Sequence, residues 1–200
     1  MAQFDTGGRT RWGRFAVTLG SGLVGAAVLV LGMAQGAIAA SFAVSGVSFK
    51  VSADKLVGDG FVQLVGVDQG AGAAHPVAVS GFRSAVLDNF CQSVLLRSVP
   101  VVGDITLVMV SAGPGGMAAT DLVIGVAGLS GDLTLVNPQL GVDAARLDKG
   151  PVKGAAGSFG LQADRATIVG LRQTSWSTSA QTIRLKNIDL SLRKGDQGCF

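Results

Sequence analysis

The chain contains no glutamate and no tyrosine, and among its 200 residues it has only one histidine and two cysteines. All 13 acidic side chains are therefore aspartates. Glutamate suits helix interiors, whereas aspartate prefers helix caps and turns, so this usage indicates strands and turns rather than helices. A zinc site needs three or four His, Cys or carboxylate ligands. With a single histidine, we predict no metal site and no other cofactor.

Charge is also absent from residues 15–40, which follow a segment with three arginines. A transmembrane helix needs about 20 apolar residues, so this stretch is long enough to cross a bilayer. The basic flank predicts that residues 1–14 stay in the cytoplasm and that residues 41–200 lie outside. Ala37 and Ala39 form a small-x-small pattern that signal peptidase cuts. Residues 15–40 are therefore either one hydrophobic anchor helix, which keeps the protein at the cell membrane, or a cleaved signal peptide of a secreted protein.

The exported part has little net charge. After residue 40 the sequence has 13 Lys and Arg against 12 Asp, so the basic pI of about 9.2 largely reflects the three N-terminal arginines. The remaining basic residues are scattered along the chain. Nucleic-acid-binding proteins carry a basic patch or stripe, so we predict no nucleic-acid partner.

Short runs of alternating apolar and polar residues dominate the exported part. They cover residues 42–51, 61–67, 76–82, 104–110, 121–126, 132–136 and 182–192. A period of two, with Gly, Asp, Asn or Pro at the ends, is typical of β-strands. We therefore predict a mostly β fold, namely a single exported antiparallel β domain that is a sandwich or a curved sheet. The best helical candidate is residues 86–96.

Two irregularities in these runs carry information. In the last run the alternation slips by one residue at Asn187, which predicts a β-bulge there. In addition, residues 48–55 (SFKVSADK) resemble residues 158–165 (SFGLQADR), and each copy continues to a glycine followed by an apolar residue. This repetition predicts a recurring strand–turn unit in which the aspartate caps a turn.

The two cysteines, Cys91 and Cys199, both lie in the exported part. Because compartments outside the cytoplasm are oxidising, we predict a disulfide between them, closing a loop of about 110 residues. The alternative is a reactive thiol pair. No Cys-x-x-Cys motif and no neighbouring histidine support that alternative.

No recognisable catalytic motif accompanies the only histidine. His75 precedes Pro76 in a Gly/Ala-rich segment that we interpret as a surface loop. The Gly-x-Ser-x-Gly elbow of serine hydrolases is absent, although residues 156–160 (AGSFG) come near it. His75 is therefore the one candidate base for a hydrolase, because a catalytic triad is a spatial arrangement and need not be contiguous in sequence.

The chain is unusually apolar, with 48% hydrophobic and 14% charged residues. A well-filled β core is one explanation. The other is an apolar groove or face for lipid, for a partner subunit or for a membrane. Trp176, within a run of Ser and Thr, is either a half-buried residue or an anchor at such an edge.

Several short motifs occur together along the chain, namely residues 34–46 (AQGAIAASFAVSG), 49–56 (FKVSADKL), 75–80 (HPVAVS), 88–93 (DNFCQS), 162–165 (QADR) and 199–200 (CF). With these motifs the chain resembles an uncharacterised exported family of streptomycetes and related actinobacteria. The family is defined by a domain of unknown function, and some members carry an automatic cholesterol esterase label. The resemblance implies an exported, envelope-associated protein and supports the pairing of Cys91 with Cys199. It supplies no catalytic residue.

These observations favour a non-enzymatic cell-envelope protein, membrane-anchored or secreted, that acts through apolar surface on membrane lipid or a membrane-protein partner. One alternative is a lipid or cholesterol esterase, a carboxylic-ester hydrolase with His75 as its base. The other is a structural surface protein whose copies assemble into homo-oligomers through sheet edges.

Overall fold

The described part of the chain forms a single sheet of ten strands. The computed structural model describes residues 43–44, 46–70 and 73–200. The elements are β1 (Ala43–Val44), β2 (Phe49–Gly70), β3 (Ala73–Asp88), β4 (Phe90–Val99), β5 (Gly103–Ser111), β6 (Met117–Val136), β7 (Gln139–Asp143), the 3₁₀ turn η1 (Ala144–Arg146), β8 (Phe159–Ser179), β9 (Thr182–Leu185) and β10 (Ile188–Lys194). All strand pairs are antiparallel except β1 with β2.

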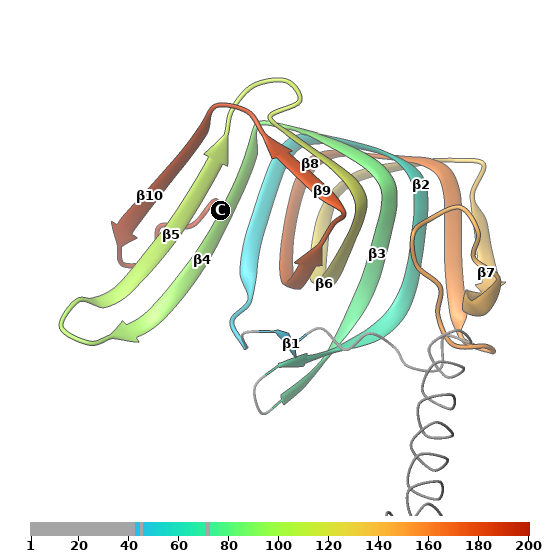
Figure 1. Ribbon diagram of the computed structural model, residues 1–200, viewed down its shortest axis with the longest axis horizontal. Helices are drawn as coiled ribbons and strands as arrows, with labels where there is room; N and C mark the ends of the chain where they lie inside the picture. The colour runs from blue at the N-terminus through green and yellow to red at the C-terminus, as the bar shows by residue number, and fades with distance from the viewer. Residues whose placement is uncertain (1–42, 45, 71–72) are drawn as a thin grey trace, which may run out of the picture. The chain divides into compact units, whose positions relative to one another are not determined.

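Four long strands close on themselves. β2 pairs with β3, β3 with β6, β6 with β8, and β8 returns to the start of β2, where Phe49 lies opposite Ser175. We call these four strands the ring. Strands β4, β5 and β10 continue the sheet from β2 as a flatter extension, which we call the wing (Figure 1). β9 pairs with the beginning of β6.

The inside of the ring is the main hydrophobic core. Side chains of alternate residues point inward, as expected of strands with one buried face. Phe61 and Phe82 are paired across β2 and β3, with ring centroids 5.0 Å apart. Gly58 allows this arrangement, because a Cβ atom on it would collide with the Phe82 ring. The other buried core residues include Leu56, Leu122 and Leu171.

Two asparagine corners separate the wing from the ring. Asn89, with φ 51°, lies between β3 and β4, and Asn187, with φ 47°, lies between β9 and β10. Asparagine tolerates this left-handed conformation better than most residues. At Asn187 the chain leaves β6 and joins β5. The slip in the alternation of the last run is therefore a corner at which the strand changes its partner.

The two similar segments occupy equivalent places. Asp54 in β2 accepts a hydrogen bond from Asn89 Nδ2 at 2.6 Å, and Asp164 in β8 accepts one from Asn137 Nδ2 at 2.7 Å. Asn137 also has a left-handed backbone, with φ 49°. Each aspartate thus holds an asparagine turn. The glycines that follow the two copies are both in the left-handed region, within strands rather than in turns.

A cap covers the outer side of β2 and β3. It consists of β7, η1 and the loop at residues 147–158, and it buries Val62 and Leu64 against Ala144 and Leu147. Arg83 donates hydrogen bonds to the main-chain oxygens of Lys149 and Asp148, at 2.6 and 2.7 Å. This half of the ring is therefore covered on both faces.

The structure corrects the expectation of a helix. Residues 86–96 are not helical but form the end of β3, the Asn89 corner and the start of β4. Of the two predicted arrangements, a sandwich or a curved sheet, the strands form one curved sheet. The strands are longer than their alternating runs, because β2 and β8 contain glycines that let them curve without ending. No helix within the described residues has the length and hydropathy needed to cross a membrane. Residues 15–40, with Ala37 and Ala39, lie outside the described residues.

Candidate functional site

The wing has one apolar face. Antiparallel pairing places directly opposite residues on the same side of a sheet. The register sets Leu190 opposite Met109 and Leu192 opposite Leu107, which in turn lies opposite Val94. The resulting apolar face consists of Val94, Leu96, Ile105, Leu107, Met109, Ile188, Leu190 and Leu192.

Much of this apolar face is open to solvent. Ile188, Leu190 and Leu192 on β10 are 53%, 63% and 69% exposed. Leu96 is also exposed, and the β5 members are half-buried. Isolated exposed apolar side chains are ordinary, but a contiguous set on neighbouring strands marks an interaction surface.

A cavity leads from the apolar face into the core. Its volume is about 280 Å³, close to the lower end of the range for small-molecule pockets, about 300 Å³. Met109 belongs both to the apolar face and to the cavity wall. Ile183 and Leu185 of β9 line the cavity, as do core residues of β2, β6 and β8. The polar side chains in the wall are Gln92, Gln173 and Thr178.

The opposite face of the wing carries polar side chains such as Ser93 and Thr106 beside Leu95, Val108 and Val110. We call it the polar face, and the C-terminal segment covers it. The predicted disulfide joins Cys91 of β4 to Cys199, across 108 residues of sequence. Cys199 N donates to Ser93 Oγ at 3.0 Å, and Thr106 Oγ1 donates to the oxygen of Gly195 at 2.6 Å. This segment therefore closes one face of the sheet and leaves the apolar face as the open one.

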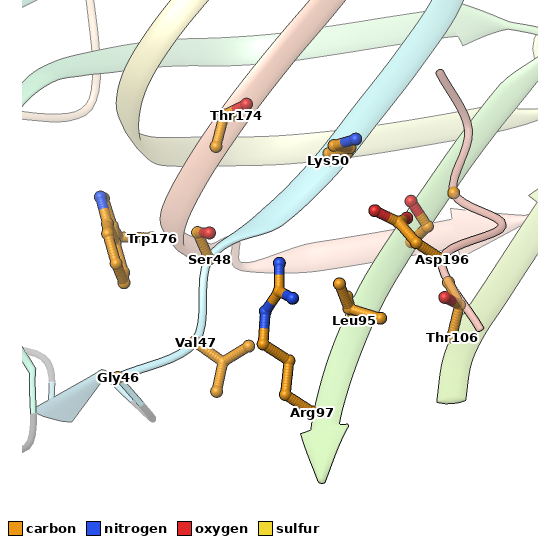
Figure 2. A pocket seen from close by; sticks show the side chains of 12 residues that line it. Gly46, Val47, Ser48, Lys50, Leu95, Arg97, Thr106, Thr174, Trp176 and Asp196 are labelled. Carbon is orange, nitrogen blue, oxygen red and sulfur yellow. The ribbon is translucent and has the colours of Figure 1, made fainter. Parts of the chain in front are cut away.

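A second, polar cavity of about 510 Å³ lies beside the C-terminal segment (Figure 2). Its wall includes Lys50, Arg97, Trp176 and Asp196. Lys50 Nζ donates to the main-chain oxygen of Phe200 at 2.9 Å, whereas Arg97 is 74% exposed and only 4.0 Å from Asp104. Figure 2 shows the Arg97 guanidinium pointing into this space, near Ser48. Besides Lys50, the wall of this cavity therefore carries a largely exposed cation, Arg97, at the limit of ion-pair distance from Asp104.

His75 lies in strand β3, not in a loop, and is half-buried rather than fully solvated. Its ring stacks on Trp176, with centroids 3.6 Å apart and planes within 9°. Its cross-strand partner is Asp68, but Asp68 accepts a hydrogen bond from Ser177 Oγ directly, at 2.6 Å. In a catalytic triad the histidine lies between the serine and the aspartate. These three residues are close together without forming that relay.

The described residues contain no group of three or more His, Cys or Asp side chains that could hold a metal ion. The ion pairs among them, Arg97–Asp104, Lys149–Asp164 and Arg165–Asp59, are at the surface. None of these pairs adjoins the apolar cavity. The side chains that line the apolar cavity include no ionisable group.

Comparison with known families gives one match. The model of a family of unknown function, DUF6230, matches residues 45–200. The chain belongs to this family. The match covers every element from β2 to β10, so the ring, the wing and both cavities lie within the region that defines the DUF6230 family. No curated protein and no solved structure is similar enough to be matched with the chain.

Sequence reasoning predicted the disulfide pair and the excess of apolar surface, but not where that surface lies. Alternation in residues 182–192 shows that Leu190 and Leu192 share a side, yet not whether that side is buried. The wall of the apolar cavity is built from residues of seven strands, and no local sequence pattern predicts such a combination.

Proposed function

We propose that this DUF6230 protein is a non-enzymatic, extracytoplasmic lipid-binding protein that holds an acyl chain in the apolar cavity and along the apolar face. The observation that carries the proposal is the continuity of the two, through Met109. A ligand with a slender apolar part could enter the cavity between β9 and β5 while the rest of it covers the β10 side chains.

A favourable free energy of binding requires both the apolar face and the apolar cavity. Burying a Leu or Ile side chain contributes about 1.5–3 kcal/mol. The three exposed side chains of β10 would thus contribute at most about 5–9 kcal/mol, against an association cost of about 4–15 kcal/mol. Contact with the apolar face alone would therefore be weak, and the additional burial inside the cavity would supply the affinity.

A lipid fits the site better than a second copy of the chain. A flat protein surface cannot fill a cavity that reaches the core residues Leu56 and Leu171. Strand addition at the free edge of β10 is discouraged by Asp189, Arg193 and Lys194, because charged residues on an edge strand oppose pairing. The proposal includes export of the domain, which is either anchored by residues 15–40 or released by cleavage after Ala39. It also includes an actinobacterial origin of the protein.

The test is to measure bound lipid in the full chain and in matched variants. Ile183→Trp places a large ring at the mouth of the cavity, where Ile183 is 47% exposed and a change is compatible with folding. Val169→Trp, on the exposed outer surface of β8, is the control. Each protein is purified in mild detergent, extracted with solvent and analysed by mass spectrometry, and is titrated with a fluorescent fatty acid.

We expect near-stoichiometric lipid and saturable probe binding in the wild type and in Val169→Trp, and loss of both in Ile183→Trp. Lipid that copurifies only because it surrounds a hydrophobic anchor helix would be present in equal amounts in all three proteins. Equal lipid content together with no saturable probe binding would contradict the proposal.

A further inference from the structure

The tip of the β4–β5 hairpin presents exposed apolar side chains. Val101 is fully exposed and has φ 71°, and Val102 is 50% exposed. A positive φ is a genuine outlier for a β-branched residue, and hairpin tips ordinarily use Gly, Asn or Asp in this conformation. A strained and exposed valine therefore suggests that its side chain serves a contact outside the domain.

This tip lies at the end of the domain where the described chain begins. β1 pairs with Gln69 and Gly70, at the end of β2. Figure 1 shows the curved β2 with both of its ends at the lower edge, and the β4–β5 hairpin points toward the same edge. The connection from β5 to β6, residues 111–116, lies at the opposite edge.

Chain connectivity links this end to a membrane. If residues 15–40 span a bilayer, which is one of the two alternatives that the sequence predicts, only two residues lie between Ala40 and Ala43, a distance of three residue steps. An extended chain covers at most about 3.6 Å per residue, so Ala43 would lie within about 11 Å of the end of the span. That distance is comparable with the thickness of the headgroup region, since a bilayer of about 40–45 Å has a hydrocarbon core of about 30 Å.

Two basic side chains, Arg97 and Lys194, lie near the apolar tip, together with two acidic ones. Arg97 precedes the tip and points into the polar cavity (Figure 2), and Lys194 at the end of β10 lies opposite Ile105. The acidic groups on this side are Asp104, 4.0 Å from Arg97, and Asp196. Apolar side chains flanked by basic residues are typical of surfaces that enter the interface of a membrane with anionic lipids.

We propose that this end of the domain rests on a lipid bilayer, with Pro100, Val101 and Val102 inserted among the headgroups and Arg97 on lipid phosphates. The proposal rests on the anchored form of the export proposed above. It also explains how an apolar ligand could reach the cavity, because the apolar face would then stand on the membrane surface.

The experiment places single tryptophans in the full chain reconstituted into liposomes. In a Trp12→Phe, Trp176→Phe background, Val101→Trp reports on the tip, and Pro114→Trp reports on the opposite edge of the domain. Lipids brominated on their acyl chains quench a tryptophan that reaches them. We expect the brominated lipids to quench most of the fluorescence of the Val101→Trp variant. The fluorescence of the Pro114→Trp variant should be unchanged. Equal quenching at both sites, or none at 101, overturns the proposal.

Two further substitutions separate membrane contact from folding. In a chain that carries Val102→Trp, adding Val101→Asn should reduce quenching while the melting temperature stays the same or rises, because asparagine accepts the left-handed conformation. A lower melting temperature with unchanged quenching would show that Val101 serves the fold and would contradict the proposal. Arg97→Gln should reduce quenching in liposomes with anionic lipid but not in phosphatidylcholine alone; an equal effect in both would refute the phosphate contact. None of these measurements depends on lipid in the cavity, so the two proposals can fail separately.

Discussion

The side-chain amide of Asn89 donates a hydrogen bond to Asp54 at 2.6 Å, at the corner where β3 leaves the ring and becomes β4 of the wing. The same asparagine accepts a hydrogen bond from Gly113 N at 2.7 Å and donates its own N–H to Gly113 O at 3.1 Å. It therefore ties three chain segments together at the boundary between the core and the apolar face.

Replacing Asn89 by alanine should destabilise the protein by about 1–3 kcal/mol, because it removes the hydrogen bonds of the side chain and places a less tolerant residue at φ 51°. Asn89→Gly removes the same bonds but accepts the backbone, so its loss should be smaller. Urea unfolding followed by circular dichroism measures both. Equal destabilisation by the two variants would show that the left-handed backbone at position 89 has no effect on the difference in stability between alanine and glycine.

The Cys91–Cys199 disulfide should stabilise the protein by about 2–5 kcal/mol, because it closes a long loop and holds the C-terminal segment on the polar face of the wing. The double variant Cys91→Ala, Cys199→Ala should unfold at lower urea and exchange the amide hydrogens of residues 195–200 faster. The wild type under reducing conditions is the matched comparison. Alkylation of both cysteines in denatured, unreduced protein would contradict the assignment.

His75 should act in packing and not in ester hydrolysis. His75→Ala removes the stack on Trp176 and should cost about 0.5–1.5 kcal/mol of stability. His75→Phe keeps an aromatic ring there without any base and should preserve stability. We expect no hydrolysis of a short-chain nitrophenyl ester by any of the three proteins. Hydrolysis by the wild type that both substitutions abolish would instead support the esterase alternative.

Acid should loosen the cap formed by β7, η1 and the following loop. Hydrogen bonds from the Ala145 and Gly157 main chain lower the pKa of Asp143 below its ordinary value, and those from Lys149 and Asn137 lower the pKa of Asp164. Because both pKa values are lower in the folded protein than in the unfolded chain, the stabilisation is complete above about pH 4. It is lost as the pH falls through the folded-state values.

This pH dependence can be measured as the melting temperature between about pH 6 and pH 2.5. The double variant Asp143→Asn, Asp164→Asn should melt lower at pH 6 and show a flatter decline toward acid. Asp132→Asn, at an exposed position outside the cap, is the control. A decline as steep in the double variant as in the wild type would show that other groups govern the acid response.

The sequence alone determined the secondary-structure class and the disulfide partners. Alternation is a local property, and it marks strands wherever neighbouring residues face opposite sides of a sheet. Only two cysteines are present, so the choice of partner follows from their number. The similar segments around Asp54 and Asp164 likewise predicted that each aspartate would hold a turn, although the asparagines that it holds could not be named.

Only the tertiary structure decided where the apolar surface lies. The apolar face joins β4 and β5 to β10, which follows them by about 80 residues, and its exposure depends on the C-terminal segment covering the other side. The closure of the ring likewise placed His75 of β3 beside Trp176 of β8, about 100 residues away. Such contacts are set by the register between distant strands and by the corners at Asn89 and Asn187, which no short sequence pattern specifies.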